Sequence, residues 1–243
     1  MNVIRILGVP FSKLGFQETV DYFTAEIKAG NRTRVMTVNP EMVMMAQGNS
    51  SMRKLIEQAH VTPDGIGIVK AARWTNQPIP ERVTGVELLV SLMEKANENN
   101  WGVYLLGAAP DVSQKAAEIL AERYPHARIV GRQDGFFNSE QEKQIVADIR
   151  EKKPELLFVA MGAPKQDEWI AKHWEALPVN LAMGVGGSLD IISGKVKRAP
   201  KFWQAIHLEW FYRLLATPSR WRRQVAIPKF IVAVLWGRLN KRT

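Results

Sequence analysis

Polar side chains follow two apolar runs in the first third of the chain. Thr37 and Asn39 lie at the end of the run at residues 35–38, and Asp64 comes just after the run at residues 60–62. An acid in a partly desolvated crevice is suited to take a proton from a substrate hydroxyl. A structural alternative exists, because Asp64 and Asn39 each precede an expected helix and could cap it.

Two glycine-containing segments in the second half of the chain could bind a phosphate or a sugar. Residues 162–168 read G-A-P-K-Q-D-E, in which Gln166 and the free amides of a helix opened by Pro164 could receive a phosphate or a sugar hydroxyl. Residues 184–190 read G-V-G-G-S-L-D, a turn that could bring backbone amides close to a diphosphate. The alternatives are that Gln166 faces water and that the glycines only allow tight packing.

Several other kinds of site are excluded or disfavoured by the sequence. The chain has no cysteine, which rules out disulfides, thiolate metal sites and thiol catalysis, and its four histidines show no spacing typical of a metal site. Neither the dinucleotide fingerprint G-x-G-x-x-G nor a Walker-type phosphate loop is present. Arg82, in P-E-R-V-T-G at residues 80–85, is by default a solvated charge.

Apolar runs alternate with helical patterns along most of the chain, and this alternation predicts an α/β protein with a doubly wound parallel sheet. Ligands bind beyond the carboxyl ends of the strands in such sheets, so Thr37, Asn39 and Asp64 should point into one crevice if their strands are parallel. The expected strands lie at residues 3–7, 34–38, 60–62, 101–106, 127–131, 156–161 and 180–185. The expected helices lie at residues 19–28, 40–47, 51–59, 66–74, 85–97, 111–124 and 139–152.

Positive charge is concentrated in the last part of the chain. From residue 195 onward there are twelve lysines and arginines against one acid, a net charge of +11, whereas the first 194 residues carry a net charge of −2. Four of the eight tryptophans also lie in this tail, at positions 203, 210, 221 and 236. Such a composition is typical of a segment that lies on an anionic membrane surface. Packing of these aromatic residues on the core and binding to nucleic acid are the alternatives.

No membrane span or secretory signal is expected. The chain has no uninterrupted apolar run of about 18 residues, and its first residues lack a basic region followed by a long apolar core. A protein that meets the membrane only through its tail would be cytoplasmic and peripheral on the inner face of the cell membrane. The apolar tail could also be covered by self-association, which makes a homo-oligomer plausible.

Six ordered motifs together resemble the WecG/TagA/CpsF glycosyltransferase family over nearly the whole chain. In this family the TagA branch transfers N-acetylmannosamine from its UDP donor to undecaprenyl-diphosphate-linked N-acetylglucosamine, the committed step of wall teichoic acid synthesis. The motifs are T-V-N-P-E (37–41), T-P-D-G-I-G (62–67), E-R-V-T-G (81–85), Y-L-L-G-A-A-P (104–110), G-A-P-K-Q-D-E-W-I (162–170) and G-V-G-G-S-L-D-I-I-S-G-K-V-K-R-A-P (184–200).

The resemblance implies a Rossmann-like doubly wound, mostly parallel sheet at residues 1–195 and a basic, helical, membrane-associating appendage at residues 196–243. It also implies an inverting hexosyltransferase that needs no metal and no cofactor. Its partners would be a UDP-sugar donor, the undecaprenyl-diphosphate-N-acetylglucosamine acceptor and an anionic membrane surface, with no role for nucleic acid.

The roles of individual residues follow from their chemistry together with this resemblance. Asp64 would be the general base, and Arg82 would assist the acceptor or its diphosphate. Arginines in the tail would reach the active site and bind the leaving UDP or the lipid diphosphate, since their paired donors fit phosphate oxygens. These arginines are Arg213, Arg220 and Arg223. The residues expected to bind the donor are Thr37, Asn39 and Gln166 for the sugar, and Gly184, Gly186, Gly187 and Asp190 for the nucleotide.

Alternatives stay open both within the family and outside it. The donor could carry N-acetylmannosamine, its uronic acid or glucose, and no single residue decides among them. A nicotinamide-dependent oxidoreductase would share the sheet but should have the glycine fingerprint that this chain lacks. A nucleic-acid-binding protein would explain the basic tail but would leave the polar strand ends without a purpose.

Overall fold

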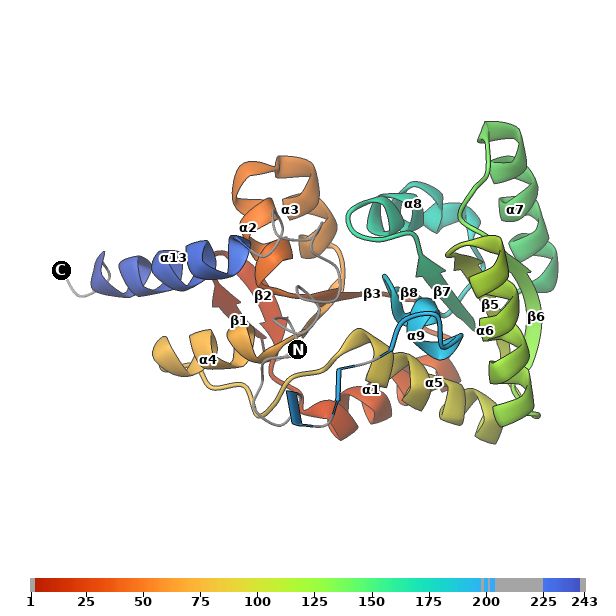
Figure 1. The fold of residues 1–243 in the computed structure, drawn as a ribbon, viewed down its shortest axis with the longest axis horizontal. Coiled ribbons are helices and arrows are strands. Elements are labelled where there is room, and N and C mark those ends of the chain that lie inside the picture. The colour runs from red at the N-terminus through yellow and green to blue at the C-terminus, as the bar shows by residue number, and fades with distance from the viewer. Residues whose placement is uncertain (1–2, 198, 201, 204–224, 241–243) are drawn as a thin grey trace.

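The computed structural model describes residues 3–197, 199–200, 202–203 and 225–240. Its central sheet has six strands, all parallel, in the order β4-β3-β8-β7-β5-β6 (Figure 1). The sheet confirms the predicted parallel α/β fold. The strands are β3 (Thr33–Val38), β4 (His60–Pro63), β5 (Gly102–Gly107), β6 (Arg128–Gln133), β7 (Leu156–Ala160) and β8 (Leu181–Gly184).

Helices cover both faces of this sheet because the strand residues are apolar on both sides, as expected for parallel strands. One face packs against α1, α5, α6 and α9. The opposite face packs against α7 and α8 at one end and against α2, α3, α4 and α13 at the other. The helices are α1 (Phe16–Lys28), α2 (Pro40–Gly48), α3 (Ser50–Glu57), α4 (Ile66–Trp74), α5 (Gly85–Asn99), α6 (Pro110–Arg123), α7 (Ser139–Lys152), α8 (Lys165–His173), the short 3₁₀ helix η1 (Trp174–Ala176), α9 (Ser188–Ile192) and α13 (Ala226–Asn240).

The strand expected at residues 3–7 exists but does not belong to the central sheet. It is β1 (Val3–Ile6), which pairs antiparallel with β2 (Val9–Ser12) in a separate two-stranded hairpin. The chain reverses at Leu7 and Gly8, whose φ angles are 48° and 82°. Tight hairpins with a two-residue loop favour positive φ at both loop positions, so Gly8 between two apolar runs was the signal for this turn.

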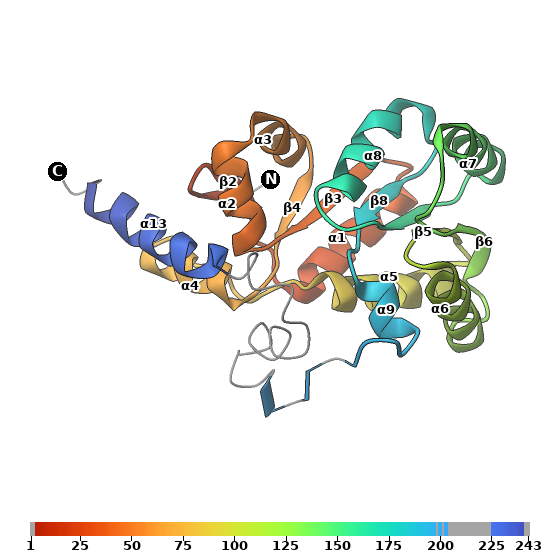
Figure 2. The same ribbon diagram turned by 45° about the horizontal axis from the view of Figure 1, so that its top comes forward.

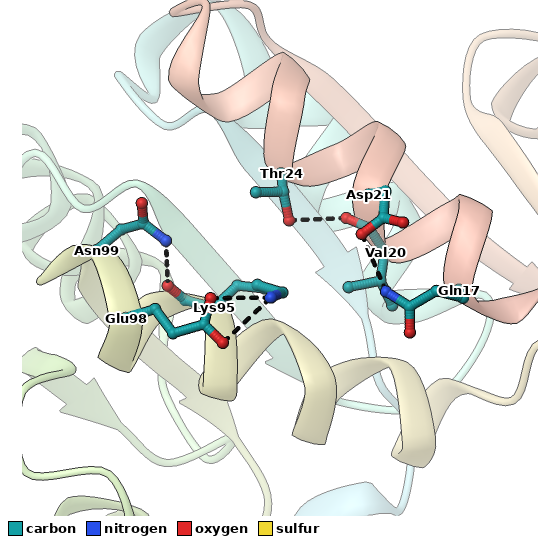
Figure 3. A network of polar contacts seen from close by, with 7 residues as sticks. All are labelled: Gln17, Val20, Asp21, Thr24, Lys95, Glu98 and Asn99. Atoms are coloured by element: carbon teal, nitrogen blue, oxygen red, sulfur yellow. Dashed lines mark hydrogen bonds and ion pairs between the residues drawn. The ribbon is translucent and has the colours of Figure 1, made fainter.

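Helices α1 and α5 pack side by side on the sheet, and Figure 3 shows how their polar residues are satisfied. Each hydrogen bond drawn there stays within one helix. On α1 the Thr24 hydroxyl donates to the Val20 carbonyl at 2.7 Å, and on α5 the Lys95 ammonium pairs with Glu98 at 2.8 Å. Apolar contacts such as those of Val20 and Leu92 therefore hold the pair together.

Helix α13 lies beside α4 and projects beyond the sheet (Figures 1 and 2). Phe230 and Val234 are buried in the same apolar cluster as α2 and α4, so this helix is attached to the body of the protein. Its other side is apolar and exposed, at Ile231, Val232, Leu235 and Trp236. None of the helices formed by the described residues is long and apolar enough to cross a bilayer.

Candidate active site

The polar residues Thr37, Asn39 and Asp64 meet at one edge of the sheet. Strands β3 and β4 are parallel and in register, with Thr37 opposite Thr62 and Val38 opposite Pro63. The Asp64 amide continues the ladder by donating to the Val38 carbonyl at 3.0 Å. The structure therefore places Thr37, the last but one residue of β3, and Asp64, the residue after β4, at the carboxyl ends of neighbouring strands, as the pattern of apolar runs predicted.

Arg82 joins this group through its loop. The Val83 amide donates to the Pro63 carbonyl at 2.8 Å, which attaches the loop to the end of β4. Arg82 is half-buried, in contrast to the solvated charge that its surroundings in the sequence suggest by default. The loop then leads into α5, and a Cβ atom added to Gly85 would lie only 3.1 Å from the Thr37 hydroxyl oxygen.

The two helices that start here differ in how they are capped. The side-chain oxygen of Asn39 accepts from the Met42 amide at 3.0 Å and so caps α2, which is the structural role considered for it. The N-cap position of α4 is Gly65, with a φ of 99°, and not Asp64.

Gln166 ties together the turns that follow β7 and β8. Its side-chain oxygen accepts from the Gly162 amide at 3.1 Å and from the Gly186 amide at 2.9 Å. The side chain is only 5% exposed, so the alternative that Gln166 faces water is wrong. A Cβ added to Gly184 would lie 2.4 Å from the Gln166 amide nitrogen, so this glycine does serve tight packing.

Asp167 is a buried acid that the sequence interpretation missed. Its carboxyl group packs against Gly184, with Oδ1 2.8 Å from the position of an added Cβ. Among the described residues, the Oδ2 atom has no hydrogen-bond partner. Burial raises the pKa of Asp167 to about 7, and the charge of Glu168 adds to this effect. Its position beside Gln166, one turn before the buried Ile170, was the available signal.

The glycine turn after β8 is more open beyond Gly184. Gly186 has a φ of 52°, and an added Cβ there would meet no atom within 4 Å. At Gly187 the nearest atom would be a carboxylate oxygen of Asp190, at 3.5 Å. Asp190, half-buried on α9, thus lies over the turn, where it can accept hydrogen bonds from a bound nucleotide.

The other titratable candidates do not form a metal site. Within the described part of the chain, no three His, Cys, Asp or Glu side chains are placed to hold a metal ion. His60 is buried against the rings of Tyr22 and Phe23, and His173 pairs with Glu142 at 2.9 Å. Both side chains therefore take part in packing or pairing within the fold. The arginines 213, 220 and 223, which were expected to reach the site, lie outside the described residues.

The two groups of candidate residues lie side by side because β3 is paired with β8. Met36 is opposite Gly184 in this pairing, so Thr37 and the turn after β8 project from adjacent strands. Neighbouring strands are about 5 Å apart, which places the end of β4, with Asp64, about 10 Å from the glycine turn. This spacing is compatible with a ligand that reaches from Asp64 to the glycine turn.

Comparisons with known proteins place this chain in a family. Residues 4–243 match the family described as the glycosyl transferase WecG/TagA/CpsF family. The chain is also similar to proteins named N-acetylglucosaminyldiphosphoundecaprenol N-acetyl-beta-D-mannosaminyltransferase. Three of these are from Bacillus spizizenii (39% identity, 83% of this chain and 78% of the relative), Bacillus subtilis strain 168 (33%, 100% and 95%) and Staphylococcus aureus strain NCTC 8325 (36%, 95% and 91%).

Proposed function

Because this chain belongs to the glycosyl transferase WecG/TagA/CpsF family, we propose that it transfers N-acetylmannosamine from UDP-N-acetylmannosamine to undecaprenyl-diphosphate-linked N-acetylglucosamine. Relatives at 33–39% identity carry the name of this reaction, which supports the proposal. The product would be the linkage unit of a wall teichoic acid. A donor with N-acetylmannosaminuronic acid or glucose is the alternative within the family.

One observation carries the proposal: the acid at the end of β4 lies two strands away from the glycine turn at the end of β8. A glycosyltransferase needs a base near the sugar and donors of hydrogen bonds near the diphosphate. Asp64 would meet the first need. The turn at residues 184–187 would meet the second through the Gly187 amide, since the Val185 and Gly186 amides already donate to the Val159 carbonyl and to Gln166.

The proposed reaction is a single displacement. Asp64 takes the proton from the acceptor hydroxyl while that oxygen attacks the anomeric carbon of the donor sugar. The bond from this carbon to the UDP oxygen breaks on the opposite face, so UDP leaves with the electron pair and the anomeric centre is inverted. Arg82 lies beside Asp64 and would stabilise negative charge on a diphosphate.

We propose that phosphate charge is balanced by arginines and that no metal ion is required. Guanidinium groups donate two parallel hydrogen bonds to phosphate oxygens, so they suit both UDP and a lipid diphosphate. Besides Arg82, the candidates are Arg213, Arg220 and Arg223 in the basic tail, which carries all of the chain's net positive charge.

Attachment to the inner face of the cell membrane is part of the proposal, since the acceptor is a lipid. It is supported by the net charge of +11 from residue 195 onward and by the exposed apolar side of α13. Tryptophan and basic residues beside an apolar helix surface are typical of segments that lie in a membrane interface.

The test is release of UDP by the purified full-length protein, with a water-soluble analogue of the lipid acceptor and a panel of UDP-sugars. We expect release that requires both the acceptor and UDP-N-acetylmannosamine, and that is lost in Asp64→Asn although this variant still binds UDP. Release with a different UDP-sugar would change the donor but keep the reaction class. Failure to bind UDP at all would refute the glycosyltransferase assignment.

A further inference from the structure

A cavity of about 470 Å³ lies between the β1–β2 hairpin, the end of α4 and helix α13. This volume falls in the range of small-molecule pockets, about 300–1,000 Å³. It is separate from the residues of the candidate active site. The residues that line it are Arg5, Ile6, Leu7, Gly8, Trp74, Thr75, Asn76, Gln77, Val234 and Gly237.

The chemistry of the walls favours an apolar ligand. Ile6, Leu7, Trp74 and Val234 supply aliphatic and aromatic surface. Arg5, the one charged residue among those lining the cavity, already pairs with a carboxylate on α3 at 2.7 Å and donates to a backbone carbonyl at 2.7 Å. The charge of Arg5 is therefore already balanced, and the other residues in the wall carry no charge with which an ionic ligand could pair.

Two helices connect the cavity with the candidate active site. Helix α4 starts two residues after Asp64 and ends at Trp74, in the cavity wall, and its nine residues span about 13 Å. Helix α2 starts at Pro40, directly after Asn39, and near its end Gln47 donates to the Leu7 carbonyl at 2.8 Å. A sugar diphosphate in an extended conformation spans a distance comparable to the length of α4.

We propose that this cavity binds the first isoprene units of the polyprenyl chain of the acceptor while the acceptor sugar lies at Asp64. The inference rests on the proposed function, which supplies a polyprenyl diphosphate acceptor. Helix α13, which lines the cavity with Val234 and Gly237, also carries exposed apolar residues on its other side, with Trp236 66% exposed. A helix of this kind can lie at the bilayer surface, which would bring the cavity near the lipid from which the polyprenyl chain emerges.

Gly237 offers a way to fill the cavity without disturbing its walls. It lies in α13 and lines the cavity, and an added Cβ would meet no atom within 4 Å. We therefore expect Gly237→Phe to fold normally and to place its ring in the cavity. Val232→Phe is the matched control, because Val232 is on the same helix but does not line the cavity. Equal melting temperatures would show that both variants are folded.

The first experiment compares N-acetylglucosamine diphosphate esters of methyl, geranyl and farnesyl alcohol as acceptors. In the wild type and in Val232→Phe, kcat/KM should rise about tenfold or more from methyl to farnesyl, because burying even a few methylene groups is worth this much. In Gly237→Phe the three acceptors should react at similar rates. If the wild type does not prefer the farnesyl acceptor, the proposal is wrong. It is also wrong if Gly237→Phe keeps the same preference as the wild type.

A binding experiment tests whether the cavity binds an isoprenoid chain, even if the protein shows no sugar transfer. Farnesyl phosphate, which carries no sugar, should change the tryptophan fluorescence of the protein when it binds. Loss of this change in Trp74→Phe would assign it to Trp74. Its affinity should fall about tenfold in Gly237→Phe and stay the same in Val232→Phe. Equal affinity for both variants would overturn the proposal. The proposal would also be overturned if dodecyl phosphate bound as tightly as farnesyl phosphate. That result would indicate that the cavity binds a linear acyl chain of the bilayer.

Discussion

The Val83 amide donates a 2.8 Å hydrogen bond to the Pro63 carbonyl, and this bond fixes the Arg82 loop next to Asp64. The two residues are separated by α4 in the sequence, yet the bond places both at the end of β4. An acid and a guanidinium group thus share one edge of the sheet, and the proposed function uses the first as the base and the second to stabilise phosphate charge.

We expect Arg82→Ala to lower kcat for UDP release by about 10²- to 10³-fold, the loss typical of removing one donor that stabilises a developing negative charge. Arg82→Lys should recover only part of the rate, because an ammonium group lacks the paired donors of a guanidinium. Steady-state kinetics of both variants check this. A kcat that is unchanged in Arg82→Ala would show that Arg82 has no part in the chemistry.

Gln166→Ala should destabilise the protein and weaken donor binding together. The substitution leaves the amides of Gly162 and Gly186 without their acceptor, which costs about 1–3 kcal/mol for each buried group that stays unsatisfied. Urea denaturation measures the first effect, and titration with UDP measures the second. If stability falls but UDP affinity does not, the glycine turn does not bind the nucleotide.

The two glycines at positions 184 and 187 should respond differently to alanine. Gly184→Ala places a methyl group 2.4 Å from the Gln166 amide, so it should destabilise the protein by about 1–3 kcal/mol. Gly187→Ala puts its methyl group at an ordinary distance of 3.5 Å from Asp190, at a φ of −84°. It should therefore be stable and change only the affinity for UDP, as measured by calorimetry.

Asp167 should make stability depend on pH in a direction opposite to that of an ion-paired acid. Its pKa is raised by burial from 3.8 to about 7, so between these values the folded state binds more protons than the unfolded state. The free energy of unfolding should therefore fall as pH rises from about 4 to about 7, and level off above. Asp167→Asn should remove this slope.

The control for this pH experiment is Asp111→Asn. Asp111 is an exposed acid whose pKa is lowered by a hydrogen bond from Lys195. Denaturation curves at several pH values should keep the wild-type slope between pH 4 and 7 in this variant. The same slope in Asp167→Asn as in the wild type would mean that the acid is ionised in the folded protein throughout.

The exposed side of α13 should determine binding to anionic vesicles. Val232→Glu with Trp236→Glu removes apolar surface and adds negative charge, so sedimentation with such vesicles should fall about tenfold or more. Phe136→Glu is the control, because Phe136 is 74% exposed but follows β6, at the other end of the molecule from α13 (Figure 1). If Phe136→Glu reduced sedimentation with the vesicles as much as the α13 double variant, α13 would not be the membrane contact.

Most of the elements and the edge at which the candidate site lies could be predicted from the sequence. The runs at residues 34–38 and 60–62 correspond to β3 and β4, and the polar residues that end them meet as expected. The reason is local: the period of apolar residues specifies a strand or a helix, and parallel strands always bring their carboxyl ends to one edge. The family resemblance rested on motifs that lie at these strand ends.

Tertiary structure alone decided what covers each element and which polar groups meet. The periodicity of residues 3–7 predicts a strand but not its partner, and the strand pairs outside the central sheet. The sequence does not separate an exposed Gln166 from one that joins two turns. For Asp167, the helical spacing to Ile170 indicates an inward position, but the degree of burial that raises its pKa depends on the tertiary structure. The apolar residues of α13 look alike in sequence, yet Phe230 is buried and Val232 is exposed. Burial depends on contacts between residues far apart in the chain, and local pattern does not contain that information.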